Sequence, residues 1–155
     1  TNKTCNWCCV VSHIFTKANV PTFEDINIKN RLWMKVIYNC VVSPLSCILD
    51  LSHKDIYCHK SSIEIANYII KEVLMIAQLE NVNISEEEAN ECLNKVIESK
   101  QDNKSSMCYD ILNKKKSEID YINGYILKLA EKHKKDLPLN KTLYFFINLM
   151  ENKYL

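Results

Sequence analysis

Apolar residues recur at spacings of three and four along much of the chain, which is the pattern of amphipathic helices. One stripe follows Ser61-Ser62-Ile63-Glu64, a capping-box sequence that typically opens a helix, and comprises Ile65, Ile69, Val73, Ile76 and Leu79. A second capping box, Ser85-Glu86-Glu87-Glu88, places acidic residues in a first helical turn, where the helix dipole favours them. The stripe after it comprises Ala89, Cys92, Leu93, Val96 and Ile97.

Prolines divide the N-terminal part of the chain into two further helices. The first is expected over residues 6–18, ending before Pro21, because the residue that precedes a proline disfavours helix. The second begins at Asp25 or Asn27, either of which can cap it. It is expected to run to about Val42, where Pro44 stops or kinks it.

The C-terminal part alternates polar loops with helices. A polar loop over 99–104 precedes a short helix at about 105–112. Ser117 then caps a helix that runs to about His133. The last helix follows Pro138 and Asn140, with a buried stripe of Leu143, Phe146, Ile147 and Met150. The sequence therefore predicts an all-α fold, a single domain of six or seven helices over residues 1–155.

The composition supports a helical globular domain. The chain has 1 glycine and 3 prolines, whereas strand-rich folds and phosphate-binding loops need many turn glycines. Hydrophobic residues make up 47% and charged residues 25%, which are values typical of globular proteins. The formal net charge of +1 indicates neither nucleic acid nor an anionic membrane as a partner. No secretory signal or membrane-length apolar run is recognised in the sequence.

The 8 cysteines include a C-x-x-C pair at Cys5 and Cys8, which is a spacing found in metal and redox sites. A zinc site needs a second pair of ligands at comparable spacing, and the sequence has none, so no metal is expected. Four other cysteines lie within apolar helical patterns, where cysteine behaves as a small buried hydrophobe: Cys40, Cys47, Cys92 and Cys108. We therefore expect a reducing, cytoplasmic setting without disulfides, although an organelle is not excluded.

Three polar residues share one face of the second helix. Lys35, Asn39 and Ser43 are spaced i, i+4 and i+8, with apolar residues between them. A lysine beside apolar neighbours is a candidate proton donor or oxyanion stabiliser, because partial burial lowers its pKa. From spacing alone, a surface lysine and a helix-facing asparagine are the better interpretation.

The densest polar stretches are 105–110 and 117–124. Structural roles explain them from the residues alone: Ser105 and Ser106 as helix caps, Glu118 as a carboxylate favoured by the helix dipole, and Asp120 as a residue that closes a cap with Ser117. No GxSxG, P-loop or HExxH signature is present.

Taken in order, these segments resemble a known family. Asn30-Arg31-Leu32-Trp33-Met34-Lys35, then Asn39 and Pro44-Leu45-Ser46, are similar to a W-x-K-x-x-x-N-x-x-x-N-P-L-T helix. Ser105-Ser106-Met107, Asp110 and the segment from Glu118 to Gly124 match serine-serine-methionine and glutamate-isoleucine-aspartate motifs at the right separation. Pro138-x-Asn140-x-x-Leu143 resembles the start of the last helix. The resemblance, from about Val10 onward, is to the C-terminal half of ketopantoate reductase.

The resemblance implies a domain of the 6-phosphogluconate dehydrogenase C-terminal-like kind within an NADPH-dependent 2-dehydropantoate 2-reductase. Such an enzyme converts ketopantoate to pantoate in pantothenate biosynthesis. Its N-terminal dinucleotide-binding domain, absent from this chain, holds NADPH and is the expected partner of the helical domain. A small 2-keto acid is the expected substrate, no metal is needed, and a homodimer is an allowed assembly. Alone, the 155-residue chain is expected to be inactive.

The resemblance also implies site roles by position. Lys35 would donate a hydrogen bond or proton to the developing alkoxide, with Glu118 as its charged partner or as a polar contact at the cleft. In substrate binding, Asn39 would contact the hydroxyl groups, Asn103 would assist, and Ser106 would hold the carboxylate. Ser43 stands where the family has a second asparagine.

Two departures leave alternatives open. Ser43 is shorter than asparagine, and His53-Lys54 stands where an asparagine-glycine turn is common. One alternative is a non-catalytic helical module, for binding or dimerisation, derived from such a reductase. The other is a sibling reductase for another branched 2-keto acid.

Overall fold

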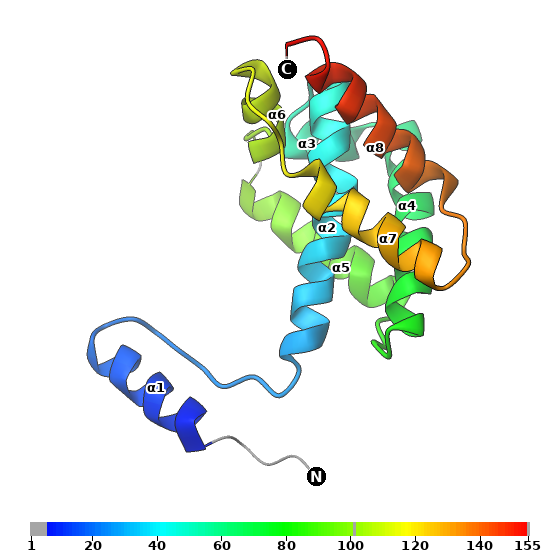
Figure 1. Ribbon diagram of the computed structural model, residues 1–155. Coiled ribbons are helices and arrows are strands. Elements are labelled where there is room, and N and C mark those ends of the chain that lie inside the picture. The colour runs from blue at the N-terminus through cyan, green and yellow to red at the C-terminus, as the bar shows by residue number, and fades with distance from the viewer. Residues whose placement is uncertain (1–5, 101, 155) are drawn as a thin grey trace.

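A computed structural model describes residues 6–100 and 102–154. Within this part of the chain there are eight α-helices, one 3-10 helix (η1) and no strand, which confirms the all-α fold (Figure 1). The helices are α1 (Asn6–Lys17), α2 (Ile28–Leu49), α3 (His53–Cys58), α4 (Lys60–Leu79), α5 (Glu86–Lys100), α6 (Ser106–Leu112), η1 (Ile119–Tyr121), α7 (Asn123–Lys132) and α8 (Pro138–Glu151).

Helix α2 forms the centre of the helical body, and α4, α6 and α8 pack against it (Figure 1). Its residues from Ile37 to Cys47 are buried, except for the half-buried Asn39. By length and composition alone α2 is also apolar enough to cross a membrane, which the sequence analysis did not recognise. Its buried middle is accounted for by packing against the other helices of the body.

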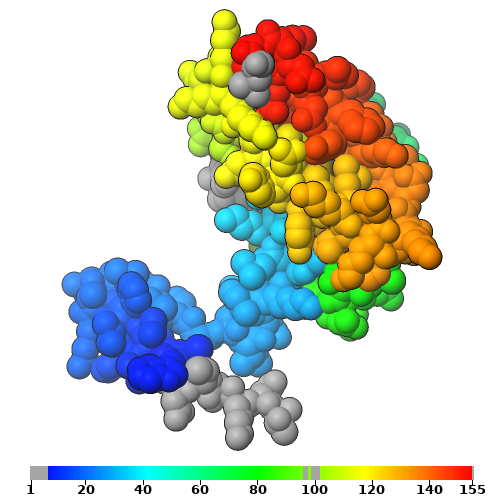
Figure 2. Space-filling view, viewed as in Figure 1, coloured from blue at the N-terminus to red at the C-terminus, as the bar shows by residue number. Residues whose placement is uncertain are grey.

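Helix α1 lies apart from this body, at the end of an extended connection (Figures 1 and 2). The space-filling view shows α1 and the connection as a separate dark-blue lobe. Apolar side chains on the lobe are exposed, including Trp7, Ile14, Phe23 and Ile26. These side chains contribute little to the core of the helical body.

Pro44 does not end α2, contrary to the sequence-based expectation, and the helix continues to Leu49. A proline inside a helix removes one donor, whose acceptor here would be the carbonyl oxygen of Cys40. The Nδ2 atom of Asn123 donates to that oxygen over 3.2 Å instead. The helix ends where Asp50 adopts a left-handed conformation with φ of 54°.

Only one of the two capping boxes forms. The backbone N–H of Glu88 donates to Ser85 Oγ over 3.1 Å, and the Glu88 carboxylate accepts from the Ser85 N–H over 2.8 Å. The first box is wrong: α4 begins at Lys60, and its N-cap residue His59 makes no side-chain cap bond. The start of α4 therefore lies earlier than the motif indicates.

Some members of the expected stripes are not buried. Ile65 and Leu79 on α4 and Phe146 on α8 are exposed, whereas Ile69, Val73, Ile76, Leu143 and Ile147 are buried as expected. Ala66 and Ala77 take core positions of α4 in addition. The side chains of Val96 and Ile97 lie outside the described residues.

The helix expected from Ser117 to His133 is divided. Glu118 is the N-cap residue of η1 and makes no side-chain cap bond, while Ser117 Oγ accepts from the N–H of Ile119 over 3.3 Å. Ile122, with ψ of −95°, separates η1 from α7. Asp120 does not close the cap with Ser117, because its carboxylate accepts from the Tyr144 hydroxyl over 2.8 Å.

Three of the four cysteines expected to be buried are buried, whereas Cys92 on α5 is half-buried. Cys40, Cys47 and Cys108 are buried, and every described cysteine is a free thiol. Cys8 is exposed, while Cys5, the other member of the C-x-x-C pair, lies outside the described residues. In the part of the chain that is described, no group of three or more His, Cys, Asp and Glu side chains is placed to hold a metal ion.

Candidate functional site

The polar face of α2 descends from solvent into the core. Lys35 is exposed, Asn39 is half-buried and Ser43 is only 6% exposed. With a rise of about 1.5 Å per residue, Lys35 and Ser43 lie roughly 12 Å apart along the axis, with Asn39 midway.

Ser105 joins the N-terminal end of α6 to α2. Its hydroxyl donates to the Ser43 carbonyl oxygen over 3.1 Å, and its backbone N–H donates to Ser46 Oγ over 3.1 Å. Ser105 Oγ also accepts from the N–H of Cys108 and so caps α6. Ser105 is thus fully used in structure, whereas the next residue, Ser106, is exposed.

The loop that carries Asn103 is fixed to the far end of α2. The backbone carbonyl oxygen of Asn103 accepts from the N–H of His53, the first residue of α3, over 3.0 Å. Next to it, Lys104 Nζ lies 2.5 Å from Asp50 Oδ1, and the hydrogen bond to Asp50 raises the pKa of Lys104. These contacts bring Asn103 and Ser106 to the end of α2 that contains Ser43.

The backbone around Glu118 is held from both sides. The N–H of Ser117 donates to the buried Glu151 carboxylate over 2.6 Å, and the Glu118 carbonyl accepts from the N–H of Tyr121 over 2.9 Å. The Glu118 side chain is exposed. Five residues later the same segment reaches α2, where Asn123 contacts Cys40.

Lys35 and Glu118 are not joined directly in the described part of the chain. No ion pair within 4.0 Å links the Lys35 ammonium to the Glu118 carboxylate among the described residues. Both side chains are exposed, Lys35 on α2 and Glu118 directly before η1. Backbone contacts thus place the segment with Asn103 and Ser106 near the Ser43 end of α2. Among the described residues no hydrogen bond joins the side chains of Ser43, Asn103 and Ser106, and Lys35 is not paired with Glu118.

His53, one of the two departures from the family pattern, makes an internal contact. The hydroxyl of Tyr38 and Nδ1 of His53 lie 3.0 Å apart in the core, and burial raises the pKa of Tyr38 to about 12. Tyr38 directly precedes Asn39. His53, the first residue of α3, is only 3% exposed and contacts α2 through Tyr38.

The thiols on α2 do not offer a nucleophile beside this face. Burial raises the pKa of Cys40, and it raises that of Cys47 to about 12. A thiol with so high a pKa carries almost no thiolate at neutral pH. The chemistry available on this face is therefore that of an ammonium, amides and hydroxyls.

The two most voluminous hollows described lie elsewhere. One, of about 580 Å³, lies between α1 and the connection, where Trp7 and Phe23 line it. The other, of about 620 Å³, lies beside the end of α4, where Met75 and Ile84 line it. None of the six predicted site residues lines either hollow.

The described residues do not fit a dinucleotide. A pyrophosphate is typically held by a glycine-rich turn at a helix N-terminus, and Gly124 is the only glycine. A Cβ at Gly124 would lie 3.0 Å from Tyr144 Cε2 and 3.3 Å from the Ile119 carbonyl oxygen. Gly124 therefore serves close packing between α7 and α8, and it is not part of a phosphate cradle.

Comparison with known proteins decides the family. A family model described as "Ketopantoate reductase PanE/ApbA C terminal" matches residues 27–151, which is most of the chain. The chain belongs to the ketopantoate reductase family. It supplies the helical C-terminal domain, and the α1 lobe lies outside the matched range.

Individual relatives agree with this assignment. The 2-dehydropantoate 2-reductase of Yersinia pestis is 34% identical over 128 residues, which are 83% of this chain and 41% of that protein. The crystal structure of a PanE/ApbA family ketopantoate reductase from Ralstonia eutropha JMP134 has a TM-score of 0.87 at 26% identity, over 94% of this chain and 49% of that chain. The chain thus spans about half the length of the ketopantoate reductases it matches.

A neighbour with another name shares the fold. The complex of D-mandelate dehydrogenase with NADH has a TM-score of 0.89 at 20% identity, over 99% of this chain and 53% of that chain. At this identity the likeness concerns the fold alone. The helical fold described here therefore also occurs in D-mandelate dehydrogenase.

Sequence reasoning missed the buried polar residues behind this face. Asn123 and Asn140 are both 0% exposed and are joined by a 3.0 Å hydrogen bond. Glu72 on α4 accepts from Asn140 Nδ2 over 2.8 Å. A signal was available, since both asparagines interrupt apolar runs, but it did not show that they would meet.

Proposed function

We propose that this chain is the substrate-binding and proton-donating domain of an NADPH-dependent 2-dehydropantoate 2-reductase. The observation that carries the proposal is the attachment of the serine pair to α2: Ser105, which directly precedes Ser106, donates to the Ser43 carbonyl oxygen, and the same helix carries Lys35 and Asn39. The family assignment supports it.

Lys35 is the proposed source of the proton. When a hydride adds to a keto carbon, negative charge develops on the carbonyl oxygen. A cation already in place stabilises that charge more than it stabilises the neutral ketone, which lowers the barrier. The exposed Lys35 ammonium on a helix whose next turns are buried is suited to this role, and it can then release a proton to the alkoxide.

Ser106 and Asn39 are the proposed contacts for the substrate's ends. Ser105 is already committed to α2 and α6, so the free hydroxyl of Ser106 is the one that can donate to a carboxylate. Asn39, half-buried midway along the face, offers an amide to the substrate hydroxyl group. Asn103 adds a further exposed amide on the anchored loop.

Glu118 is proposed to face the same space from the opposite wall. Its backbone is fixed on the segment that leads to Asn123 and α2, so its carboxylate comes from a rigid support. Since Lys35 and Glu118 do not form an ion pair here, we propose that they approach each other when substrate is bound. Such closure would also exclude water from the reacting oxygen.

The hydride is proposed to come from a second domain. NADPH supplies it, and the dinucleotide-binding domain expected N-terminal to this chain would hold that cofactor. The exposed apolar side chains of the α1 lobe, such as Trp7 and Phe23, offer a surface for such a domain. We propose a cytoplasmic two-domain protein; a homodimer remains a prediction that its mass in solution can test.

Two measurements test this function. The sequence encoded before Thr1 should contain a strand followed by G-x-G-x-x-G, and its absence would contradict the two-domain reductase. The longer protein should then oxidise NADPH with ketopantoate, whereas the 155-residue chain alone should neither turn over nor bind NADPH at low-micromolar affinity.

Site variants of the longer protein refine the test. Asn39→Ala and Ser106→Ala should raise KM for ketopantoate, because each removes one hydrogen bond to substrate. Ser61→Ala, an exposed serine on α4, is the matched control and should leave KM unchanged. A KM that is unchanged in both Asn39→Ala and Ser106→Ala would remove these two residues from the site.

A sibling reductase is the second candidate, and Ser43 favours it. Its side chain is buried and shorter than asparagine, so a substrate contact is lost at that position. A panel of branched 2-keto acids separates the two: higher kcat/KM for another acid than for ketopantoate would favour the sibling. No turnover with any acid would favour the non-catalytic module.

A further inference from the structure

Pro44 leaves a gap in the hydrogen-bond ladder of α2. In a regular helix the N–H of residue 44 would donate to the carbonyl oxygen of Cys40, and proline has no N–H. Cys40 is completely buried, so water cannot replace the missing donor. The Asn123 amide, from the first position of α7, occupies that place at 3.2 Å.

A second buried amide holds Asn123 in this orientation. The same Nδ2 atom donates its other hydrogen to Oδ1 of Asn140 over 3.0 Å. Both hydrogens of the Asn123 amide are thus used, one on α2 and one on α8. An amide fixed at both hydrogens cannot rotate away from Cys40 without losing two bonds.

Glu72 anchors the other end of the network. Its Oε2 accepts from Asn140 Nδ2 over 2.8 Å and from the Asn140 N–H over 2.9 Å, while its Oε1 accepts from the N–H of Leu139 over 2.9 Å. The first backbone N–H groups of a helix lack helical partners, and a carboxylate is favoured there. Glu72 on α4 therefore fixes the start of α8 and, through Asn140, the position of Asn123.

The gap divides the proposed substrate face. Asn39 directly precedes Cys40, and Lys35 lies one turn further back, whereas Ser43 directly precedes Pro44. Helices bend or open where a ladder bond is missing. We propose that Asn123 is a positioning residue: it closes the Pro44 gap from outside and keeps the Lys35–Asn39 half of α2 in register with the Ser43 half. The term "substrate face" rests on the proposed function, while the closure of the gap does not.

A double-mutant cycle on the 155-residue chain tests the closure. Asn123→Ala leaves the Cys40 oxygen without this donor, and the equilibrium constant for folding should fall roughly tenfold to hundredfold. Pro44→Ala restores a backbone N–H at position 44. Pro44→Ala should therefore raise the equilibrium constant for folding at least about fivefold more in the Asn123→Ala background than in the unmodified chain. If the effect of Pro44→Ala on this constant is the same in both backgrounds to within about twofold, the proposal is overturned.

Asn148 provides a matched control. Its Nδ2 donates to the carbonyl oxygen of Tyr144 over 2.8 Å within α8, where no proline is involved. Asn148→Ala removes the same type of hydrogen bond, and it should combine additively with Pro44→Ala. Coupling of equal size at Asn148 would show that the rescue is general and would contradict a specific link to Asn123.

Hydrogen exchange separates positioning from simple core stability. In Asn123→Ala, backbone amides of α2 around the gap should lose protection relative to those of α4, and Pro44→Ala should restore it. A uniform loss over both helices would contradict the positioning role. If Asn123→Ala alone does not fold, folding of the double variant supports the proposal.

If neither variant folds, the unmodified chain decides. Slow exchange of the Asn123 side-chain hydrogens, with a scalar coupling across the bond to the Cys40 carbonyl, supports the proposal. Exchange as fast as that of an exposed amide overturns it. Neither measurement needs substrate or cofactor, so failure here would leave the proposed reductase function standing, and failure of the Lys35 role would leave this cycle unchanged.

Discussion

The hydroxyl of Ser105 donates to the backbone carbonyl oxygen of Ser43 over 3.1 Å. This bond joins two motifs that are distant in sequence, the serine pair and the polar face of α2. It also distinguishes the two neighbouring serines, because Ser105 is buried in structure and Ser106 remains exposed. The family motif does not make this distinction by itself.

Ser105→Ala should destabilise the chain, and Ser106→Ala should not. Ser105 loses its cap on α6 and its bond to α2, so the free energy of unfolding should fall by about 1–3 kcal/mol. Ser106→Ala should change it by less than about 0.5 kcal/mol. Urea unfolding of the two variants measures both values. Equal losses would contradict the division of roles between the two serines.

The two capping-box sequences should respond differently to the same substitution. Ser85→Ala removes an observed cap and should cost about 1 kcal/mol. Ser61→Ala, at an exposed position where no cap bond to the α4 N-terminus is made, should be nearly neutral. Thermal or urea unfolding checks the difference. A loss at Ser61 as large as that at Ser85 would show that the first box forms after all.

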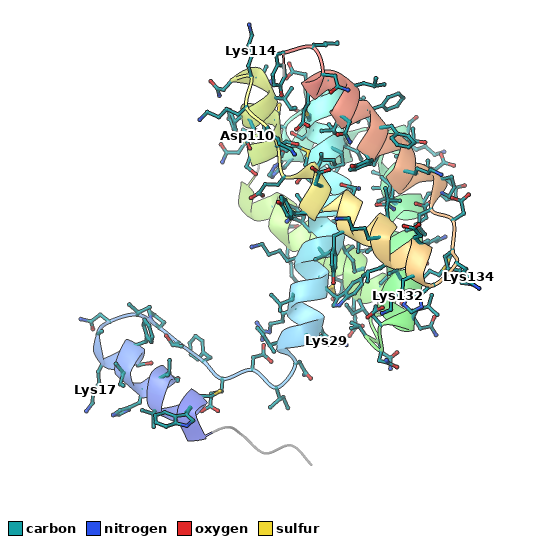
Figure 3. All side chains as sticks on the ribbon, in the orientation of Figure 1. Lys17, Lys29, Asp110, Lys114, Lys132 and Lys134 are labelled. Atoms are coloured by element: carbon teal, nitrogen blue, oxygen red, sulfur yellow. The ribbon has the colours of Figure 1, made fainter. Side chains whose placement is uncertain are left out.

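Stability should decline in acid through Glu80. The Glu80 carboxylate accepts from Lys132 Nζ over 2.7 Å and lies 2.6 Å from His133 Nε2, which ties α4 to the end of α7, where Lys132 is labelled in Figure 3. The hydrogen bond from Lys132, followed by that of His133, lowers the pKa of Glu80 from 4.5 to about 2. A group whose pKa is lower in the folded state contributes stability above its unfolded pKa and loses it on protonation.

The contribution of Glu80 should therefore be complete above pH 4.5 and be lost as the pH falls toward about 2. Urea midpoints measured across this window should fall less steeply for Glu80→Gln than for the unmodified chain. Glu64→Gln, on the exposed side of α4, is the control and should keep the original slope. An unchanged slope for Glu80→Gln would remove Glu80 as a source of acid sensitivity.

The sequence predicted helix starts correctly where the cap is made by residues close together in the chain. The box at Ser85 and Glu88 and the cap at Ser105 depend on residues within three positions of each other, and both form. The end of α2 could not be predicted in this way. Where Pro44 lacks an N–H, the Cys40 carbonyl oxygen accepts from the Asn123 amide, which is 83 positions from Cys40 in the chain.

The site residues remain a prediction from the ordered motifs, and their geometry could not be predicted from the sequence. The ordered motifs selected Lys35, Asn39 and Ser106, and the structure shows their exposure and anchoring. The sequence did not show that the Ser105 hydroxyl would donate to the Ser43 carbonyl oxygen. Nor did it show that Lys35 and Glu118 would not form an ion pair in this domain. Those features depend on how α2, α6 and η1 pack, which only the three-dimensional structure provides.

The proton-donating role proposed for Lys35 can be tested by comparing two lysine variants. In the longer two-domain protein, NADPH oxidation with ketopantoate should be measured for Lys35→Ala beside Lys60→Ala, an exposed lysine at the start of α4. Loss of a cation at the developing alkoxide should lower kcat/KM by about a hundredfold or more, with the control within about twofold. Retention of most of the turnover in Lys35→Ala would contradict the account.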